Sequence, residues 1–248
     1  DGIKSYKIKQ GVLKNMINQC IFAVSDNDSR PVYTGSMFEV ENGVLAMVSV
    51  DGYRLAIRRE AIEGPEEHNE FIVPATALAD IERISDADSE EDTGIYVGAN
   101  HVSFIVGSTV VISRRLEGDF LNYRKAMPDT FKLHIKVGRT ELLRVVDRVA
   151  LIIDEKTKNP VRMTFNENFI DCLCNTPIGK AEDVCFSEGD GEGLEIGFNG
   201  KYLMDALKAA PADEIDLCLN GNTSPCIMTP TDGSETFKYM ILPIRLRS

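Results

Sequence analysis

The segments LKNMINQCIFAV, residues 13–24, and LLRVVDRVALII, residues 142–153, carry one apolar pattern 129 residues apart. In the first segment the pattern consists of Leu13, Ile17, Cys20, Ile21 and Val24. The matching positions of the second are Leu142, Val146, Val149, Ala150 and Ile153. Spacings of four, seven, eight and eleven residues are typical of the buried face of an amphipathic helix. The recurrence predicts that one structural unit occurs twice in the chain.

Later features of the sequence repeat in the same order. A proline follows each predicted helix, as Pro31 and as Pro160, again 129 residues apart. A second, shorter helix is predicted from Pro74 in the first half and from Asn199 in the second, because proline suits a first helical turn and asparagine caps helix N-termini. We therefore predict two domains, residues 1–127 and 128–248, with the boundary after Met127.

Short segments rich in β-branched and aromatic residues lie between and after the predicted helices. In the first half they are residues 44–50, 94–97, 102–106 and 110–113, and in the second half 169–174, 195–198, 215–219 and 239–244. Residues 41–43, Glu-Asn-Gly, and 98–100, Gly-Ala-Asn, are turn signals between such segments. These patterns predict an α+β fold in which each domain packs two helices on antiparallel sheet.

The composition restricts the location and chemistry of the protein. A chain of 248 residues with 43% hydrophobic residues can form two cores. It contains no apolar run of about 18 residues and no signal-peptide pattern at residue 1, which predicts a cytoplasmic protein without membrane contact. The six cysteines form no CxxC pair and the three histidines are far apart, so we expect no metal or cofactor. Cys172 and Cys174, which share one face of a predicted strand, leave a disulfide or metal site as the alternative.

The charge pattern bears on nucleic-acid binding. A net charge of −12 argues by itself against a nucleic-acid-binding protein, because phosphate contacts require clustered Lys and Arg. Much of this acidity falls in residues 85–92 and 188–193, which we predict to be solvated loops. The distribution of charge therefore leaves room for a basic surface elsewhere.

Residues 50–56, VDGYRLA, resemble the signature of the bacterial DNA polymerase III beta subunit family, the sliding clamps, in which an Asp-Gly turn precedes an aromatic residue or His, then Arg and Leu. Four further motifs match the family in the correct order: RPVYTG at 30–35, GDFLNYR at 118–124, EIGFN at 195–199 and LPIRL at 242–246. The resemblance covers nearly the whole chain and corresponds to the second and third of the family's three DNA-clamp-like domains. We expect a fragment that lacks the first domain. Val50 and Leu121 depart from the family pattern, where Thr and Pro are common.

The resemblance implies a non-catalytic processivity factor of the replicative polymerase. In the family, two full-length chains form a homodimer ring around duplex DNA, without sequence specificity. Helix residues that would face the DNA are Lys14, Arg83, Arg144, Arg148, Lys201 and Lys208. The alternative is that these are ordinary solvated side chains on helix surfaces.

The resemblance also implies a cleft between the second and third domains that binds short linear motifs of polymerase subunits, the clamp loader and repair proteins. Family positions carried over to the first half, up to the predicted boundary, are Tyr33, Val50, Gly52, Tyr53, Arg54, Leu55, Leu121, Lys125 and Ala126. Those of the second half are Asn199, Tyr202, Thr223, Met240, Ile241, Leu242, Pro243, Ile244 and Arg245, with Lys158 less securely aligned. From the residues alone, Val50, Leu55 and Leu242 could instead belong to the core.

Two other classes of function remain open from the residues. An enzyme would need an acid–base group, for which Asp51 beside Tyr53 and Arg54 is a candidate, but the sequence contains no hydrolase, metalloprotease or nucleotide-binding motif. An Asp at this place is also the usual first polar residue of a turn. The other alternative is a two-domain protein-interaction scaffold that does not bind DNA.

Overall fold

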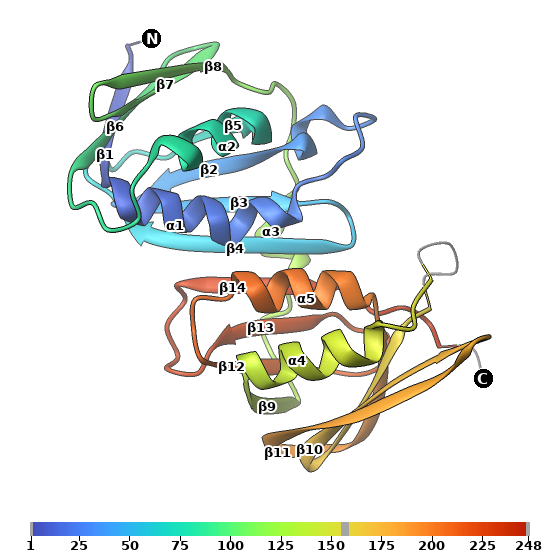
Figure 1. Ribbon diagram of the computed structural model, residues 1–248. Helices are drawn as coiled ribbons and strands as arrows, with labels where there is room; N and C mark the ends of the chain where they lie inside the picture. Colours follow the sequence, from blue (N-terminus) through green and yellow to red (C-terminus); the bar gives the residue numbers. More distant parts are fainter. Residues whose placement is uncertain (1, 155–158, 247–248) are drawn as a thin grey trace. The chain divides into compact units, whose positions relative to one another are not determined.

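The computed structural model describes residues 2–154 and 159–246, which are coloured along the chain in Figure 1. The chain divides into two compact units, residues 1–124 (unit 1) and residues 125–248 (unit 2). The sequence-based boundary after Met127 lies three residues beyond this division and stays a prediction.

Unit 1 contains two helices and two antiparallel sheets. Its strands are β1 (Lys4–Lys9), β2 (Gly35–Glu41), β3 (Val44–Val50), β4 (Arg54–Ala61), β5 (Asn69–Pro74), β6 (Asp92–Val97), β7 (His101–Val106) and β8 (Thr109–Arg114). The strand order is β1-β6-β7-β8 in one sheet and β4-β3-β2-β5 in the other. Helices α1 (Gln10–Cys20) and α2 (Ala75–Ile84) lie side by side and contact strands of both sheets. The short helix α3 (Tyr123–Ala126) follows.

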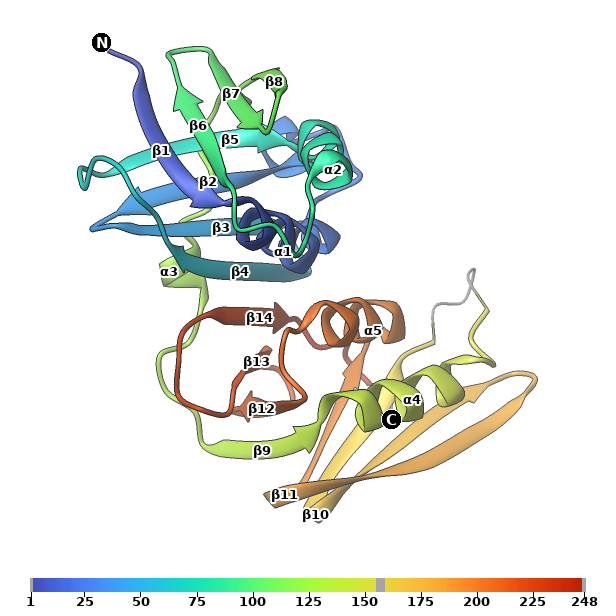
Figure 2. The same ribbon diagram turned by 60° about the vertical axis from the view of Figure 1, so that its left-hand side comes forward.

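Unit 2 repeats the pairing of two helices with antiparallel sheet. Its strands are β9 (Leu133–Gly138), β10 (Val161–Thr176), β11 (Gly179–Phe198), β12 (Glu214–Leu219), β13 (Cys226–Pro230) and β14 (Phe237–Ile241), in the order β10-β11-β9-β12-β13-β14. Helices α4 (Arg139–Ala150) and α5 (Gly200–Ala209) pack against each other, and α4 also packs on β9, β10 and β11 (Figure 2). The predicted α+β fold with two helices per domain is confirmed.

The predicted apolar helix faces form the cores. On α4, Leu142, Val146 and Val149 are at most 1% exposed, whereas Arg144 and Arg148 on the other side are exposed. The first predicted helix is shorter than its apolar pattern. α1 ends at Cys20, and a 3-10 turn, η1 (Ile21–Ala23), tightens the chain after it.

The Asn42-Gly43 turn signal is confirmed. Asn42 and Gly43 have φ angles of 52° and 74° and join β2 to β3, as a tight hairpin turn requires. The turn predicted at residues 98–100 likewise joins β6 to β7.

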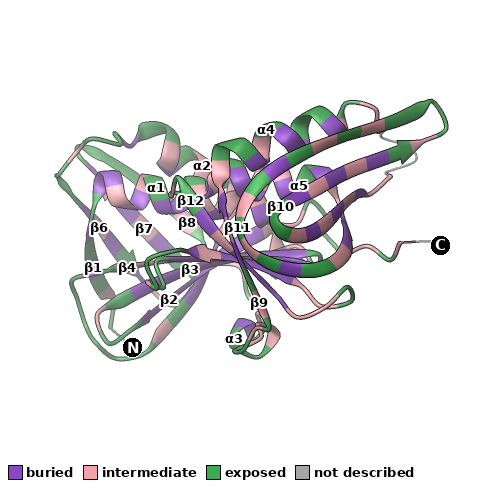
Figure 3. Ribbon diagram, turned by 90° about the horizontal axis from the view of Figure 1, so that it is seen from below, coloured by how far each residue is buried: buried purple, intermediate pink, exposed green. Residues whose placement is uncertain are grey.

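The strand pattern of unit 2 corrects the sequence analysis. The predicted segments 169–174 and 195–198 are parts of two long strands, β10 and β11, which form one hairpin with register shifts near Glu167. In β10 buried residues alternate with half-buried ones on either side of the exposed residues 167–169, whereas β11 is mostly exposed or half-buried before Ile196 (Figure 3). Residues 188–193, predicted as a loop, lie within β11. A Cβ atom on Gly191 would come within 2.3 Å of the Phe165 Cβ. The glycine at this position therefore allows β11 to approach β10 closely.

No helix in the described part of the chain is long and apolar enough to cross a membrane.

Candidate binding surfaces

The VDGYRLA motif forms the turn between β3 and β4. Val50 and Leu55 are cross-strand partners at the end of this hairpin and are 3% and 0% exposed. The Asp51 Oδ1 atom accepts hydrogen bonds from the backbone N–H groups of Tyr53 (2.8 Å) and Arg54 (3.0 Å). These bonds explain why an Asp begins the turn, since its carboxylate satisfies two backbone donors. Asp51 therefore has a structural role, and nothing in its surroundings indicates a general base.

Arg54 is held by the same turn. Its Nε atom donates to Asp51 Oδ2 at 2.9 Å, and its guanidinium lies 5.6 Å from the centre of the Phe22 ring. The Arg54 residue is only 7% exposed. Gly52, with a φ of 93°, lets the chain reverse, and Tyr53 at the tip is 62% exposed. Tyr53 is thus the motif side chain most available to a ligand.

Tyr33 and Leu121 lie outside the strands of unit 1, Tyr33 just before β2 and Leu121 between β8 and α3. Tyr33, in the 3-10 helix η2 (Pro31–Thr34), packs edge-to-face on Phe120 with ring centres 5.4 Å apart. Leu121 follows Phe120 and is 36% exposed. The ring contact fixes the start of the segment that carries Leu121.

A buried acid also holds this segment. The Tyr123 hydroxyl donates to Glu39 Oε2 at 2.5 Å, and Arg124 donates to Glu39 Oε1 at 2.7 Å. Burial disfavours the Glu39 carboxylate, yet the hydrogen bonds from Arg124 and Tyr123 outweigh burial and lower the pKa of Glu39. Burial and the adjacent Glu39 raise the pKa of Tyr123 to about 12. Tyr123 and Arg124 belong to the GDFLNYR motif, but no local pattern predicts their pairing with Glu39, which is 84 and 85 residues away.

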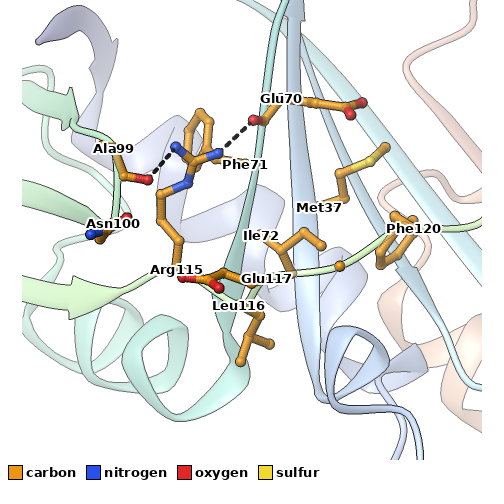
Figure 4. A pocket seen from close by; sticks show the side chains of 11 residues that line it. Met37, Glu70, Phe71, Ile72, Ala99, Asn100, Arg115, Leu116, Glu117 and Phe120 are labelled. Carbon is orange, nitrogen blue, oxygen red and sulfur yellow. Dashed lines mark hydrogen bonds between the residues drawn. The ribbon is translucent and has the colours of Figure 1, made fainter. Parts of the chain in front are cut away.

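Unit 1 has a cavity of about 430 Å³, drawn in Figure 4. Arg115 crosses it and donates to the backbone oxygens of Ala99 (3.2 Å) and Glu70 (3.0 Å). Met37 and Phe120 line it as well. None of the predicted binding residues belongs to this cavity.

Unit 2 has two cavities that contain predicted residues. One, of about 430 Å³, is lined by Thr223, Ile244 and Arg245. The Ile244 N–H donates to the Gly197 oxygen at 2.7 Å, which pins the C-terminal segment to β11. The other, of about 550 Å³, is lined by Asn199 and Tyr202 at the start of α5.

Asn199 caps helix α5. Its Oδ1 atom accepts from the backbone N–H groups of Lys201 (3.0 Å) and Tyr202 (3.3 Å). The N-cap role expected from the sequence is therefore present, and it occupies the side-chain oxygen that a peptide could otherwise use.

The remaining predicted peptide residues differ in exposure. Met240 and Ile241 are buried at the end of β14, and Leu242 and Pro243 after it are half-buried. Lys125 is exposed and Ala126 half-buried, both in α3. Lys158 lies outside the described residues. The structure thus groups part of the predicted set around one turn in unit 1 and around two cavities in unit 2.

Five of the six predicted DNA-facing cations fall into two groups. Arg144, Lys201 and Lys208 are exposed on α4 and α5, and none has an ion pair with another described residue. Arg148 and Arg83 are exposed but paired, with Asp183 at 2.5 Å and Asp80 at 3.0 Å.

Lys14 has a different role. Its Nζ donates to the backbone oxygens of Glu82 (2.7 Å) and Ser85 (3.0 Å) and pairs with the Glu82 carboxylate at 2.8 Å. Because free carbonyls mark a helix C-terminus, this lysine joins α1 to the end of α2. Its predicted role in facing DNA stays a prediction.

Comparison with known proteins covers both units. Residues 7–122 match the family model of the DNA polymerase III beta subunit, central domain, and residues 124–245 match that of its C-terminal domain. The beta sliding clamp of Staphylococcus aureus (strain Mu50) is 35% identical over 236 residues, 94% of this chain and 62% of the relative.

Solved structures agree with these matches. The DNA polymerase sliding clamp of Bacillus subtilis superposes with a TM-score of 0.93 at 31% identity, over 98% of this chain and 64% of that one. A putative DNA polymerase III beta subunit from Eubacterium rectale superposes with a TM-score of 0.91 at 31% identity, over 97% of this chain and 65% of that one. The fold and its repeat thus define a tandem pair of DNA-clamp domains. The chain belongs to the DNA polymerase III beta subunit family, and it spans 62% of the length of its curated relatives.

Proposed function

We propose that this chain supplies the central and C-terminal domains of a DNA sliding clamp, a non-catalytic processivity factor that acts in the cytoplasm. The observation that carries the proposal is the pair of consecutive domain matches over residues 7–245, on two units with the same helix-and-sheet plan. The whole subunit would close as a homodimer ring around duplex DNA. Relatives named beta sliding clamps support this assignment.

The helix surfaces of unit 2 support contact with DNA. Arg144, Lys201 and Lys208 direct positive charge away from the apolar core of an acidic protein. A ring that slides requires weak attraction to phosphates and no reading of base edges, and exposed cations on helices provide the former without the latter. This observation favours a clamp over a scaffold that does not bind DNA.

We further propose that the peptide-binding residues named above capture short linear motifs of polymerase subunits, the clamp loader and repair proteins. Exposed Tyr53 and the cavity lined by Thr223 and Arg245 offer polar and aromatic contacts. Met240, a flexible side chain, suits varied apolar anchors. The structure of a DnaN sliding clamp from Pseudomonas aeruginosa bound to griselimycin supports ligand binding on this fold.

Calorimetry with a pentapeptide tests the proposal. The peptide carries Gln followed by Leu and ends in Phe, and we expect micromolar affinity, about −8 kcal/mol or weaker, because a short ligand buries little area. Leu242→Ala should weaken binding by about 1–3 kcal/mol if its side chain contacts an apolar anchor. Arg148→Ala, on the exposed face of α4, is the matched control and should bind as the wild type does. Absence of peptide binding to the folded wild-type chain would refute the peptide proposal.

A further inference from the structure

Three chemically distinct metal-ligand groups meet on unit 2. His134 lies on β9, and Asp216 and Cys218 lie on the adjacent strand β12, where His134 is directly opposite Cys218. Asp216 and Cys218 are two residues apart, so their side chains share one face of the sheet with His134. The neighbouring residues Ile135 and Leu217 point to the other face and belong to the core.

The distances between the ligand atoms suit a small metal ion. Cys218 Sγ lies 3.6 Å from His134 Nδ1 and 3.5 Å from Asp216 Oδ2, and His134 Nδ1 lies 2.7 Å from Asp216 Oδ2. Ligands about 2.0–2.3 Å from a tetrahedral Zn²⁺ ion lie about 3.3–3.8 Å from one another. The two sulfur distances already fall in that range, and the His–Asp pair needs to open by about half an ångström.

The second oxygen of Asp216 gives independent support. Oδ1 is buried and has no hydrogen-bond partner in the part of the chain that the structure describes. A buried carboxylate oxygen without a donor is costly, and a cation bound to the carboxylate would remove that cost. The Asp216 side chain is 22% exposed and that of His134 is 56% exposed, so an ion and a water ligand can enter from solvent.

Nearby positive charges are already neutralised. Lys136, which is opposite Asp216, pairs with Glu214 at 3.2 Å and Glu188 at 3.6 Å. Lys238 pairs with Glu235 at 2.5 Å. Neither lysine occupies the Asp216 carboxylate, which leaves it available to an added cation.

We propose that His134, Asp216 and Cys218 bind one borderline-soft divalent cation, with Zn²⁺ the best fit, and that water completes a four-coordinate site. A ligand set of one nitrogen, one oxygen and one sulfur favours zinc over magnesium or calcium, which prefer oxygen alone. The ion would link β9 to β12 and so stabilise unit 2. No sequence pattern indicates this site, because His134 and Cys218 are 84 residues apart and the strand register brings them together.

Zinc and cobalt titrations of the chelator-treated 248-residue chain test the inference. We expect one zinc ion per chain by calorimetry, a rise in melting temperature, and with Co²⁺ both a thiolate-to-metal absorption band and the visible spectrum of a four-coordinate ion. His134→Gln and Cys218→Ser should each weaken zinc binding at least about tenfold, since even groups that only orient ligands contribute that much. Cys218→Ser should also abolish the thiolate band.

His68→Gln is the matched control. It disrupts another His–carboxylate group of the chain, with Glu39 and Glu70, that contains no thiol. Its zinc affinity should equal that of the wild type. No saturable zinc binding, or equal affinity in His134→Gln and the wild type together with no thiolate band for Co²⁺, would overturn the inference. His134 is exposed, so its variant tests the site even if Cys218→Ser fails to fold.

Discussion

The Asp51–Arg54 ion pair of unit 1 is largely buried, whereas the Arg148–Asp183 pair of unit 2 lies at the surface. In unit 1 the Asp51 and Arg54 side chains are 11% and 8% exposed, and Lys14 joins the two helices. In unit 2 the Arg148–Asp183 pair is 56% and 29% exposed. The same arrangement of helices and sheet therefore carries a buried ion pair in one unit and an exposed ion pair in the other. Buried pairs fix local structure, while exposed cations remain available for external contacts.

The largest predicted effect removes the carboxylate of the buried pair. Asp51→Ala should lower the unfolding free energy of unit 1 by about 3–5 kcal/mol, because the buried Arg54 guanidinium loses its carboxylate partner and two turn N–H groups lose their acceptor. Urea denaturation followed by far-ultraviolet circular dichroism measures this. Asp51→Ala combined with Arg54→Met should be less destabilised than Asp51→Ala alone. If the double variant is the less stable, the charge argument fails.

A second prediction concerns pH and Glu39. The pKa of Glu39 is lowered in the folded state, so its ionisation stabilises unit 1 above about pH 4.5, the ordinary value. That stability should disappear as the pH falls through the lower folded pKa. Glu39→Gln should cost about 1–3 kcal/mol at neutral pH by weakening the bond from Arg124. It should also flatten the loss of stability in acid. An unchanged acid profile would contradict this assignment.

A third prediction compares the starts of the second helices. Asn199→Ala should destabilise unit 2 by about 1 kcal/mol, because α5 loses the side-chain acceptor of two backbone N–H groups. Asn199→Ser, which keeps a capping oxygen, should recover most of this. Pro74, at the start of α2, makes no side-chain cap, so Pro74→Ala should show no comparable capping loss. Melting temperatures of the Asn199→Ala, Asn199→Ser and Pro74→Ala variants measure this difference. An equal loss in Pro74→Ala and Asn199→Ala would contradict it.

The smallest effect should come from the exposed pair. A double-mutant cycle of Arg148→Ala and Asp183→Ala should give a coupling energy below about 1 kcal/mol that shrinks as salt is added. Chemical denaturation at low and high ionic strength provides the comparison with the Asp51–Arg54 pair. A coupling as large as that of the buried pair would remove the distinction between the units.

The sequence predicted those features that depend on local periodicity and missed those that depend on register. The buried stripe of Leu142, Val146 and Val149 follows from helical spacing. Residues 188–193 were wrongly assigned to a loop because glycines and acids disfavour strands, whereas Glu188 pairs with β9 and Asp190 with β10, contacts that local sequence does not reveal. The role of Lys14 was hidden because its partners, Glu82 and Ser85, are 68 and 71 residues away.

In the candidate binding surfaces, too, local features could be predicted and long-range contacts could not. The positions of Gly52 and Tyr53 in a turn followed from the Asp-Gly signal, and the Asn199 cap followed from residue type. The burial of Arg54 did not, because an arginine is ordinarily exposed and its contacts with Asp51 and Phe22 are not visible in the local pattern. A family motif thus identified the region without separating residues that hold the turn from residues free to contact a ligand.

Methyl NMR of the chain labelled at its eight methionines tests the central claim of partner-peptide capture most directly. The Met240 resonance, assigned with Met240→Leu, should move in proportion to saturation when the Gln-Leu…Phe pentapeptide is added. The resonance of Met16, fully buried on α1, should not move. Saturable peptide binding that leaves Met240 unmoved, or no binding at millimolar peptide, would contradict the account.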